Sequence, residues 1–138
     1  MKNLLFILIS ILLISCEKEE VIKDNGYIHF SNNKNESVIM FENQHDFILN
    51  GKTVCLNEED FVKFNLYLNN LVNAKNISNT YCLRNAQPYD YIYKILYYKN
   101  NKLNEIILVA DCSILPKEVE DVFLFMSSAL YMWENEKK

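Results

Sequence analysis

The stretch YIYKILYYKNNKLNEIILVADC, residues 91–112, decides the fold. Two apolar runs, Tyr91–Tyr98 and Leu103–Cys112, flank the polar pair Asn100-Asn101, and this pattern predicts a long β-hairpin. With those two residues as the loop, one face of the hairpin is aromatic and aliphatic. The expected register on that face pairs Tyr93 with Leu108, Ile95 with Ile106 and Tyr97 with Asn104.

The opposite face of this hairpin is too apolar for a surface that meets only water. Two interpretations follow: the two strands are central in a sheet, or their outer face meets a partner. The residues of this face are Ile92, Lys94, Leu96, Tyr98, Glu105, Ile107 and Val109.

Two shorter hairpins precede the long one. The first joins Tyr27–Phe30 to Ser37–Phe41 across an asparagine-rich turn. In the second, Phe47–Leu49 and Thr53–Leu56 flank Asn50-Gly51, a dipeptide that tolerates the positive φ angles of a type I′ turn. A further short strand is expected at Tyr81–Leu83.

Two helices are predicted by apolar residues that recur every three or four positions. Asn57 can cap the first helix, which should run to about Lys75, and Pro116 suits the first turn of the second. Their apolar stripes are Phe61, Phe64, Leu68, Leu71 and Val72, and Val119, Val122, Phe123, Met126, Ala129, Leu130 and Trp133. The sequence therefore predicts a single α+β domain: a mostly antiparallel sheet of hairpins with two helices packed on it.

The length and composition of the chain are those of one globular domain, and its charge limits the kinds of partner it can bind. The 138 residues are half hydrophobic, which excludes a disordered chain. The chain has 14 basic and 18 acidic residues, so its net charge is −4. This balance argues against nucleic acid as a partner and favours a basic protein.

The N-terminus has the features of an export signal. A short positive start, Met1–Asn3, precedes the apolar run Leu4–Ile14, which is too short to cross a bilayer as a permanent helix. Leu13-Ile14-Ser15-Cys16 resembles the lipobox of bacterial lipoproteins. The resemblance covers the first sixteen residues; it implies removal of residues 1–15, lipid on Cys16 and attachment to a membrane. The alternatives are an ordinary signal peptide with a chance cysteine and a buried N-terminal helix.

Residues 16–26 form an acidic tether ahead of the globular domain, residues 27–138. Glu17-Lys18-Glu19-Glu20 resembles the stretch that sends some Bacteroidetes lipoproteins to the cell surface. A plain solvated tether would have the same composition. The expected location is the bacterial envelope, at the outer membrane, facing either the periplasm or the surface.

Three cysteines remain beyond Cys16: Cys55, Cys82 and Cys112. In an oxidising compartment, one disulfide and one free thiol are the simplest expectation. The pairing cannot be deduced from the sequence. No two cysteines have the CxxC spacing of a redox motif or zinc site.

No residue pattern indicates catalysis. His29, in a strand, is expected to be an ordinary half-exposed histidine, and His45, in a turn, to be solvated. The sequence around the cysteines lacks the local signatures that accompany the nucleophile of a Cys–His hydrolase. Metal-binding motifs and glycine-rich phosphate-binding motifs are also missing from the sequence. We therefore predict no catalytic residue, metal or cofactor.

Tyrosine is the residue type that best indicates a binding surface, because it offers a large contact area with a polar tip. The core takes many of the tyrosines, so Tyr91, Tyr98 and Trp133 are the candidates for contact with a partner.

These observations favour a lipid-anchored, non-catalytic protein-binding module. Its most concrete form is an immunity or inhibitor lipoprotein that neutralises an antibacterial toxin or hydrolase. The alternative is an accessory structural lipoprotein of an envelope secretion or surface-glycan machine. A small Cys- or carboxylate-dependent hydrolase is the least favoured hypothesis.

Overall fold

A computed structural model describes residues 26–136, with side chains as far as Tyr131. Seven strands form one sheet in the order β4-β3-β2-β1-β6-β7-β5. Neighbouring strands are antiparallel except for β5 and β7, which are parallel. The strands are β1 (Tyr27–Asn32), β2 (Ser37–Phe41), β3 (Asp46–Leu49), β4 (Lys52–Cys55), β5 (Thr80–Tyr81), β6 (Ile92–Lys99) and β7 (Lys102–Val109).

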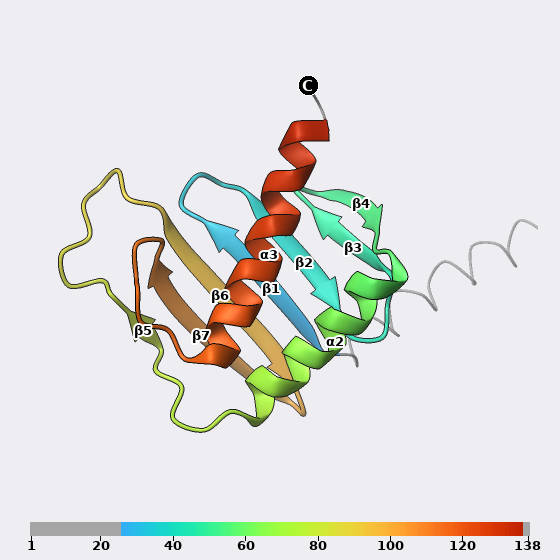
Figure 1. The fold of residues 1–138 in the computed structure, drawn as a ribbon, viewed down its shortest axis with the longest axis horizontal. Coiled ribbons are helices and arrows are strands. Elements are labelled where there is room, and N and C mark those ends of the chain that lie inside the picture. Colours follow the sequence, from blue (N-terminus) through green and yellow to red (C-terminus); the bar gives the residue numbers. More distant parts are fainter. Residues whose placement is uncertain (1–25, 137–138) are drawn as a thin grey trace, which may run out of the picture.

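Two helices, α2 (Glu58–Asn73) and α3 (Lys117–Glu136), lie on the same face of this sheet (Figure 1). Their apolar stripes face the sheet, as the sequence predicts; the fully buried members are Phe64, Leu68, Leu71, Val119, Val122, Met126 and Leu130. The α+β class and the mostly antiparallel sheet are confirmed.

The described helices do not include a membrane span, because neither α2 nor α3 combines the necessary length with the necessary hydropathy. The proposed signal peptide (1–15), Cys16 and the tether up to residue 25 lie outside the described residues.

The register of the long hairpin is confirmed. Tyr93 lies opposite Leu108, Ile95 opposite Ile106 and Tyr97 opposite Asn104. β6 has β1 on one side and β7 on the other, so it is a central strand. β7 ends at Val109 and not at Cys112, because the Cys112 amide turns back to donate to the Val109 carbonyl oxygen (3.0 Å).

Positive φ angles close both of the hairpins that have two-residue loops. In the β3–β4 loop, Asn50 has φ 47° and Gly51 has φ 79°; in the β6–β7 loop, Asn100 and Asn101 have φ 55° and 61°. Positive φ at both positions is typical of a type I′ turn, which the sequence predicts for Asn50-Gly51, and the Asn100-Asn101 loop has the same pair of positive φ angles.

We expect Gly51→Ala to destabilise the domain by about 1–2 kcal/mol. A Cβ at this position would have no heavy atom within 4 Å, so the cost arises from the left-handed backbone alone. Urea unfolding measures the effect. Gly51→Asn should lose less, because asparagine tolerates this conformation better; equal stability of Gly51→Ala and the wild type would contradict the turn geometry.

The ends of the two helices lie close to where capping residues in the sequence predicted them. Asn57 caps α2 as predicted, with its Oδ1 accepting from the Asp60 amide (2.8 Å). The helix ends at Asn73, slightly before the expected Lys75. Pro116 directly precedes α3, and its carbonyl oxygen accepts from the Glu120 amide (2.9 Å).

The expected strand Tyr81–Leu83 is shifted to Thr80–Tyr81. Cys82 has φ 59°, a left-handed conformation that ends the strand and turns the chain away from β7. The chain then enters a long loop that returns at β6.

Aromatic side chains link the sheet to α3. The Phe30 ring centroid lies 5.2 Å from that of Tyr93 and 6.0 Å from that of Phe123. The Tyr93 hydroxyl lies 2.7 Å from the Tyr131 hydroxyl. Burial, followed by this hydrogen bond, raises the pKa of Tyr93 well above its usual value, so the phenol stays protonated.

Candidate functional site

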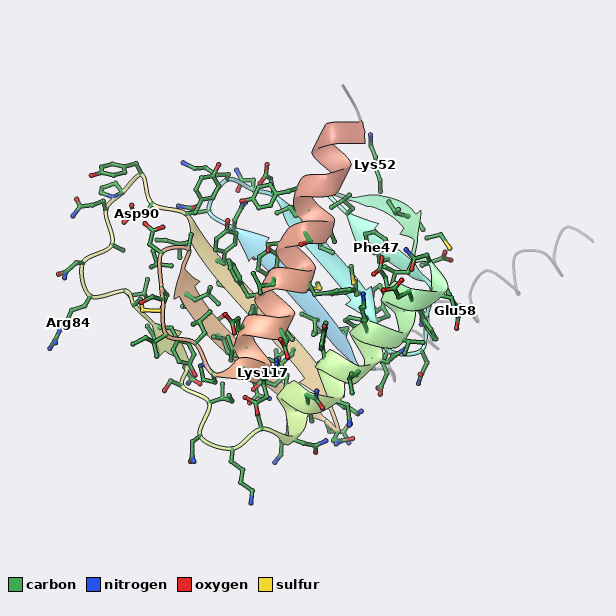
Figure 2. The ribbon with its side chains drawn as sticks, in the orientation of Figure 1. Phe47, Lys52, Glu58, Arg84, Asp90 and Lys117 are labelled. Atoms are coloured by element: carbon green, nitrogen blue, oxygen red, sulfur yellow. A yellow bond between two sulfur atoms is a disulfide. The ribbon has the colours of Figure 1, made fainter. Side chains whose placement is uncertain are left out.

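A disulfide joins Cys82 to Cys112, with Cα atoms 5.5 Å apart. Cys55 is the free thiol among the described residues and is exposed on the edge strand β4. The structure thus agrees with one disulfide and one thiol, and it supplies the pairing that the sequence left open. We call the two segments next to this disulfide, residues 82–91 and 110–115, the disulfide rim; its sulfur–sulfur bond is visible in Figure 2.

Hydrogen bonds fix the longer segment of the disulfide rim. The Asn33 side chain donates to the Asp90 carbonyl oxygen (2.7 Å) and accepts from the Ile92 amide (3.2 Å). The Asp90 carboxylate accepts from the Gln87 amide (2.6 Å), which closes a turn inside the loop. With Cys82 held by the disulfide, this loop is anchored at both ends.

The disulfide rim carries the most exposed large apolar side chains. Of the eight such side chains among the described residues, the two most exposed are Ile114 (82%) and Tyr89 (74%), and Tyr91 (41%) lies two positions after Tyr89. Sequence reasoning identified Tyr91 but missed Tyr89 and Ile114. The signal for Tyr89 was present, because it follows Pro88 in a segment that has neither helix nor strand periodicity.

The three residues predicted to contact a partner do not form one surface. Tyr91 directly precedes β6, and Tyr98 lies near the far end of that strand. Tyr91 stacks on Tyr93 (6.1 Å between ring centroids), toward the helices, whereas Tyr98 stacks on Tyr27 (5.6 Å) on the other face of the sheet. Trp133 belongs to α3, but its side chain lies outside the described residues.

The face of the sheet that α2 and α3 leave uncovered is the second notable surface, here called the open face (Figure 1). Its side chains are mostly half-buried by one another, and one ion pair, Lys94 Nζ to Glu105 Oε2 (3.6 Å), crosses it. Its apolar and aromatic members are Tyr27, Ile39, Phe41, Ile48, Ile92, Leu96, Tyr98, Leu103, Ile107 and Val109. The hairpin strands are internal, since β6 and β7 each have a strand on both sides, and among the described residues no helix covers their outer face.

His29 lies on the open face of β1, half-buried as expected. Burial lowers the pKa of its imidazole below 6.5, and the positive charge of Lys94 lowers it further. The imidazole is therefore neutral at neutral pH.

We expect His29 to reduce stability in acid. Its pKa is lower in the folded state, so below about pH 6.5 the unfolded chain binds the proton more readily. Stability from this group is complete above pH 6.5 and is lost as the pH falls toward the folded-state pKa. Urea unfolding midpoints from about pH 8 to about pH 5 measure the loss. His29→Gln should lose less over the same range; an identical profile would contradict the assignment.

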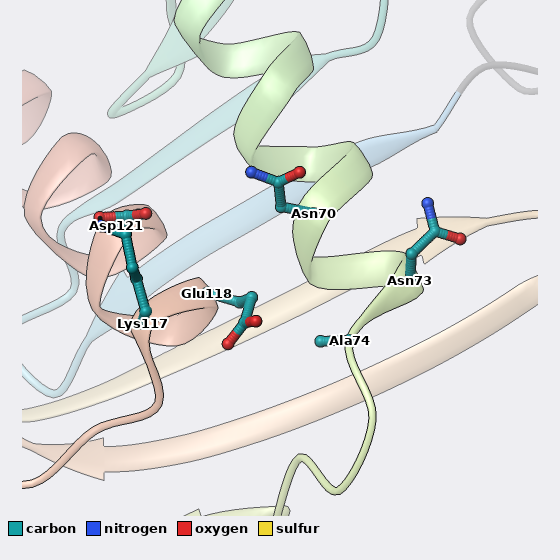
Figure 3. Close-up of a pocket in the computed structure, with 6 residues that line it drawn as sticks. All are labelled: Asn70, Asn73, Ala74, Lys117, Glu118 and Asp121. Atoms are coloured by element: carbon teal, nitrogen blue, oxygen red, sulfur yellow. Dashed lines mark hydrogen bonds and ion pairs between the residues drawn. The ribbon is translucent and has the colours of Figure 1, made fainter.

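A shallow pocket of about 210 Å³ lies between the end of α2 and the start of α3 (Figure 3). Its lining is Asn70, Asn73, Ala74, Lys117, Glu118 and Asp121. Lys117 Nζ lies 3.2 Å from the Asp121 carboxylate, and this pair raises the pKa of the lysine. The pocket offers amides and carboxylates but no thiol or imidazole, so its lining contains no nucleophile paired with a histidine.

Within the described residues, no hydrogen bond joins His45 to the thiol of Cys55. Each contacts neighbouring side-chain or backbone groups instead. His45 stacks on Phe61 (3.9 Å between ring centroids) and lies 3.0 Å from Glu58 Oε2. The Cys55 sulfur contacts the Leu56 carbonyl oxygen (3.6 Å). In this part of the chain, no three His, Cys, Asp or Glu side chains gather as metal ligands would.

The fold and the disulfide rim define a two-layer α+β protein whose long loop is fastened by a disulfide. None of the protein-family models, curated proteins and solved structures with which the chain was compared matches it.

Proposed function

We propose that this chain is a lipid-anchored, non-catalytic protein-binding module of the bacterial envelope, acting as an immunity or inhibitor protein against an antibacterial toxin or hydrolase. The observation that carries the proposal is the disulfide rim. Its loop holds Tyr89 and Tyr91 at the surface, and Ile114 lies across the disulfide. Exposed apolar side chains on a fixed loop favour binding, because little conformational freedom is lost on association.

The charge of the chain supports a basic partner. Acidic side chains concentrate where the two helices begin, at Glu58–Asp60 of α2 and at Glu118 and Glu120 of α3. A net charge of −4 attracts a cationic protein over distances longer than any single contact and speeds association at low salt.

The proposal is tested with the full lipidated chain, solubilised in detergent and mixed with proteins that the same cells secrete or export. We expect a one-to-one complex with a single toxin or hydrolase, whose activity falls as the complex forms. Replacing Tyr89 and Ile114 together by serine should weaken the complex by about tenfold or more. Replacing Val62 and Leu66, two other large apolar side chains that are exposed on α2, by serine should leave the affinity unchanged.

Three results would contradict the proposal. A complex made only of envelope-machine components would favour the structural alternative. Turnover of a substrate by the purified chain would favour an enzyme. A chain that forms no stoichiometric complex would not be an inhibitor.

The lipid anchor is tested separately through Cys16, which lies outside the described residues. We expect Cys16→Ala to abolish labelling with a radioactive fatty acid and to move the protein out of the membrane fraction. Cys55→Ala, which removes the free exposed thiol, should be labelled like the wild type. Labelling that persists in Cys16→Ala would contradict the lipoprotein assignment.

The open face supports the second candidate, an accessory structural lipoprotein. A half-apolar sheet face is a surface on which another subunit can pack. Deleting the gene should then impair assembly or transport by an envelope machine, whereas normal assembly and transport in the deletion strain would contradict this role.

A further inference from the structure

Three aromatic rings and a leucine form a row across one end of the open face. Tyr27 begins β1, and its neighbours across the sheet are Phe41, at the end of β2, and Tyr98, near the end of β6. The Tyr27 ring centroid lies 6.4 Å from that of Phe41 and 5.6 Å from that of Tyr98. Leu103 of β7, opposite Tyr98, continues the row and is 60% exposed. We call these four side chains the aromatic row.

The chain enters the described domain at the aromatic row. The Gly26 carbonyl oxygen accepts from the Glu42 amide (2.7 Å), and the Gly26 amide donates to the Glu42 carboxylate (3.3 Å), so the start of β1 is fixed. Tyr27 is eleven positions after Cys16. Eleven residues span at most about 40 Å even when fully extended. A lipid on Cys16 would therefore hold the aromatic row close to a bilayer at a high effective concentration.

The charges around the aromatic row nearly cancel. Lys99 pairs with Glu42 (2.8 Å). Asp46, at the start of β3, and Lys102, at the start of β7, are exposed, have opposite signs and form no ion pair with other described residues. A surface of this kind suits zwitterionic lipid headgroups better than a strongly anionic surface.

Building on the lipid anchor of the proposed function, we propose that the aromatic row docks on the surface of the zwitterionic phospholipid bilayer that holds Cys16. Tyrosine is enriched at the membrane–water interface because its ring is apolar and its hydroxyl is polar. The Tyr98 hydroxyl donates to Asn101 Oδ1 (3.0 Å), so it keeps a hydrogen bond when the ring leaves water. Leu103 reaches the boundary of the acyl chains and buries its exposed side chain there.

This docking orients the rest of the domain. Tyr91, next to the disulfide rim, is seven positions before Tyr98 along β6. Seven residues of strand span about 23 Å, so the two surfaces lie at opposite ends of the sheet. A bilayer at the aromatic row leaves the disulfide rim facing the water from which a toxin or hydrolase would arrive.

Tryptophan fluorescence of the full lipidated chain in vesicles tests the docking. The vesicles contain phosphatidylethanolamine and a phosphatidylcholine whose acyl chains carry bromine, which quenches a nearby indole. Trp133, the only tryptophan, is replaced by phenylalanine in every variant. We expect bromine to quench Leu103→Trp about twofold or more strongly than Tyr89→Trp, the matched control on the disulfide rim. Equal quenching at the two positions, or stronger quenching at position 89, would overturn the proposal.

A second set of variants tests the apolar character of the aromatic row. Tyr27→Trp keeps an aromatic ring in the row and serves as the reporter. Adding Leu103→Asp places a carboxylate against the bilayer and should reduce the quenching of this reporter by about half or more. Leu66→Asp makes the same change on α2, where Leu66 is 54% exposed, and should leave the quenching unchanged. A reporter that responds to neither substitution, or to both equally, would contradict docking through the row.

Crosslinking in living cells distinguishes a bilayer from a protein subunit on this surface. The photoreactive residue p-benzoylphenylalanine replaces Leu103 in the full chain. We expect its adducts to be phospholipids, identified by the added mass. Adducts with protein alone would overturn the proposal and favour the accessory structural role.

The docking and the proposed function can be told apart when one of them fails. If the chain carries no fatty acid on Cys16, the lipid anchor and the docking fail together. If Cys16 is lipidated but positions 103 and 89 are quenched alike, the anchor stands and the docking fails. If position 103 is quenched as expected but the chain inhibits no toxin or hydrolase, the docking stands and the inhibitor function fails.

Discussion

Replacing Phe30 by alanine should lower the free energy of unfolding by about 3–5 kcal/mol. The Phe30 side chain is fully buried in the central strand β1, between Tyr93 of β6 and Phe123 of α3. Truncation removes the ring that packs between the sheet and α3. It leaves a cavity that the neighbouring side chains, held in the packed core, fill only in part. Urea unfolding followed by circular dichroism measures the loss.

Tyr89→Ala is the matched control for Phe30→Ala, because it removes an aromatic ring that is 74% exposed. We expect its stability to change by no more than about 0.5 kcal/mol. A loss below about 1 kcal/mol for Phe30→Ala would mean that this ring is not part of a packed core.

Removing the disulfide with Cys82→Ser and Cys112→Ser should cost about 3–4 kcal/mol, because the crosslink closes a loop over 30 residues and restricts the unfolded chain. The loss is measured by urea unfolding of the double variant and the wild type under oxidising conditions. Cys55→Ser should leave stability unchanged, because its side chain is exposed and forms no disulfide, and a serine hydroxyl can also donate to the Leu56 carbonyl oxygen.

Reduction of the wild-type protein offers an independent check of the pairing. A reductant should lower the stability of the wild type and of Cys55→Ser by the same amount, and it should leave the double variant unchanged. A large effect of reductant on the double variant would show that Cys55 forms a disulfide.

Local patterns predicted those parts of the fold that are held by residues close in sequence. The Asn100-Asn101 loop set the register of β6 and β7, so Tyr93 opposite Leu108 followed by counting outward. Asn57 marked the start of α2 because a cap acts within one helical turn.

The pairing of strands and cysteines that are far apart in the sequence could not be predicted from local patterns. The pairing of β1 with β6 joins Tyr27 to Tyr98, and β5 pairs with β7 in parallel after a crossover. No local pattern specifies a neighbour so far along the chain. The disulfide was equally undetermined, because any two of the three cysteines could pair until the fold brought Cys82 to Cys112.

The candidate site was predicted only in part. Tyr91 was identified because tyrosines cluster around the long hairpin. Alternation along β6 places Tyr98 on the other face, which was foreseeable, but its stacking on Tyr27 depends on the β1–β6 pairing. Tyr89 lies in a loop without periodicity, where exposure follows from tertiary structure alone.

The central position of β1 determines the order in which the domain can be completed. Among the described strands β1 is made first, and it pairs with β2 as soon as the first hairpin emerges. Its other edge stays unpaired until residues 93–98 of β6 arrive, after most of the chain has been synthesised. Pairing between strands that are far apart in the sequence is slow. Until it occurs, the unpaired edge of β1 can pair with other chains. Folding should therefore be limited by the docking of the β6–β7 hairpin onto β1, and a chain released before residue 98 should aggregate.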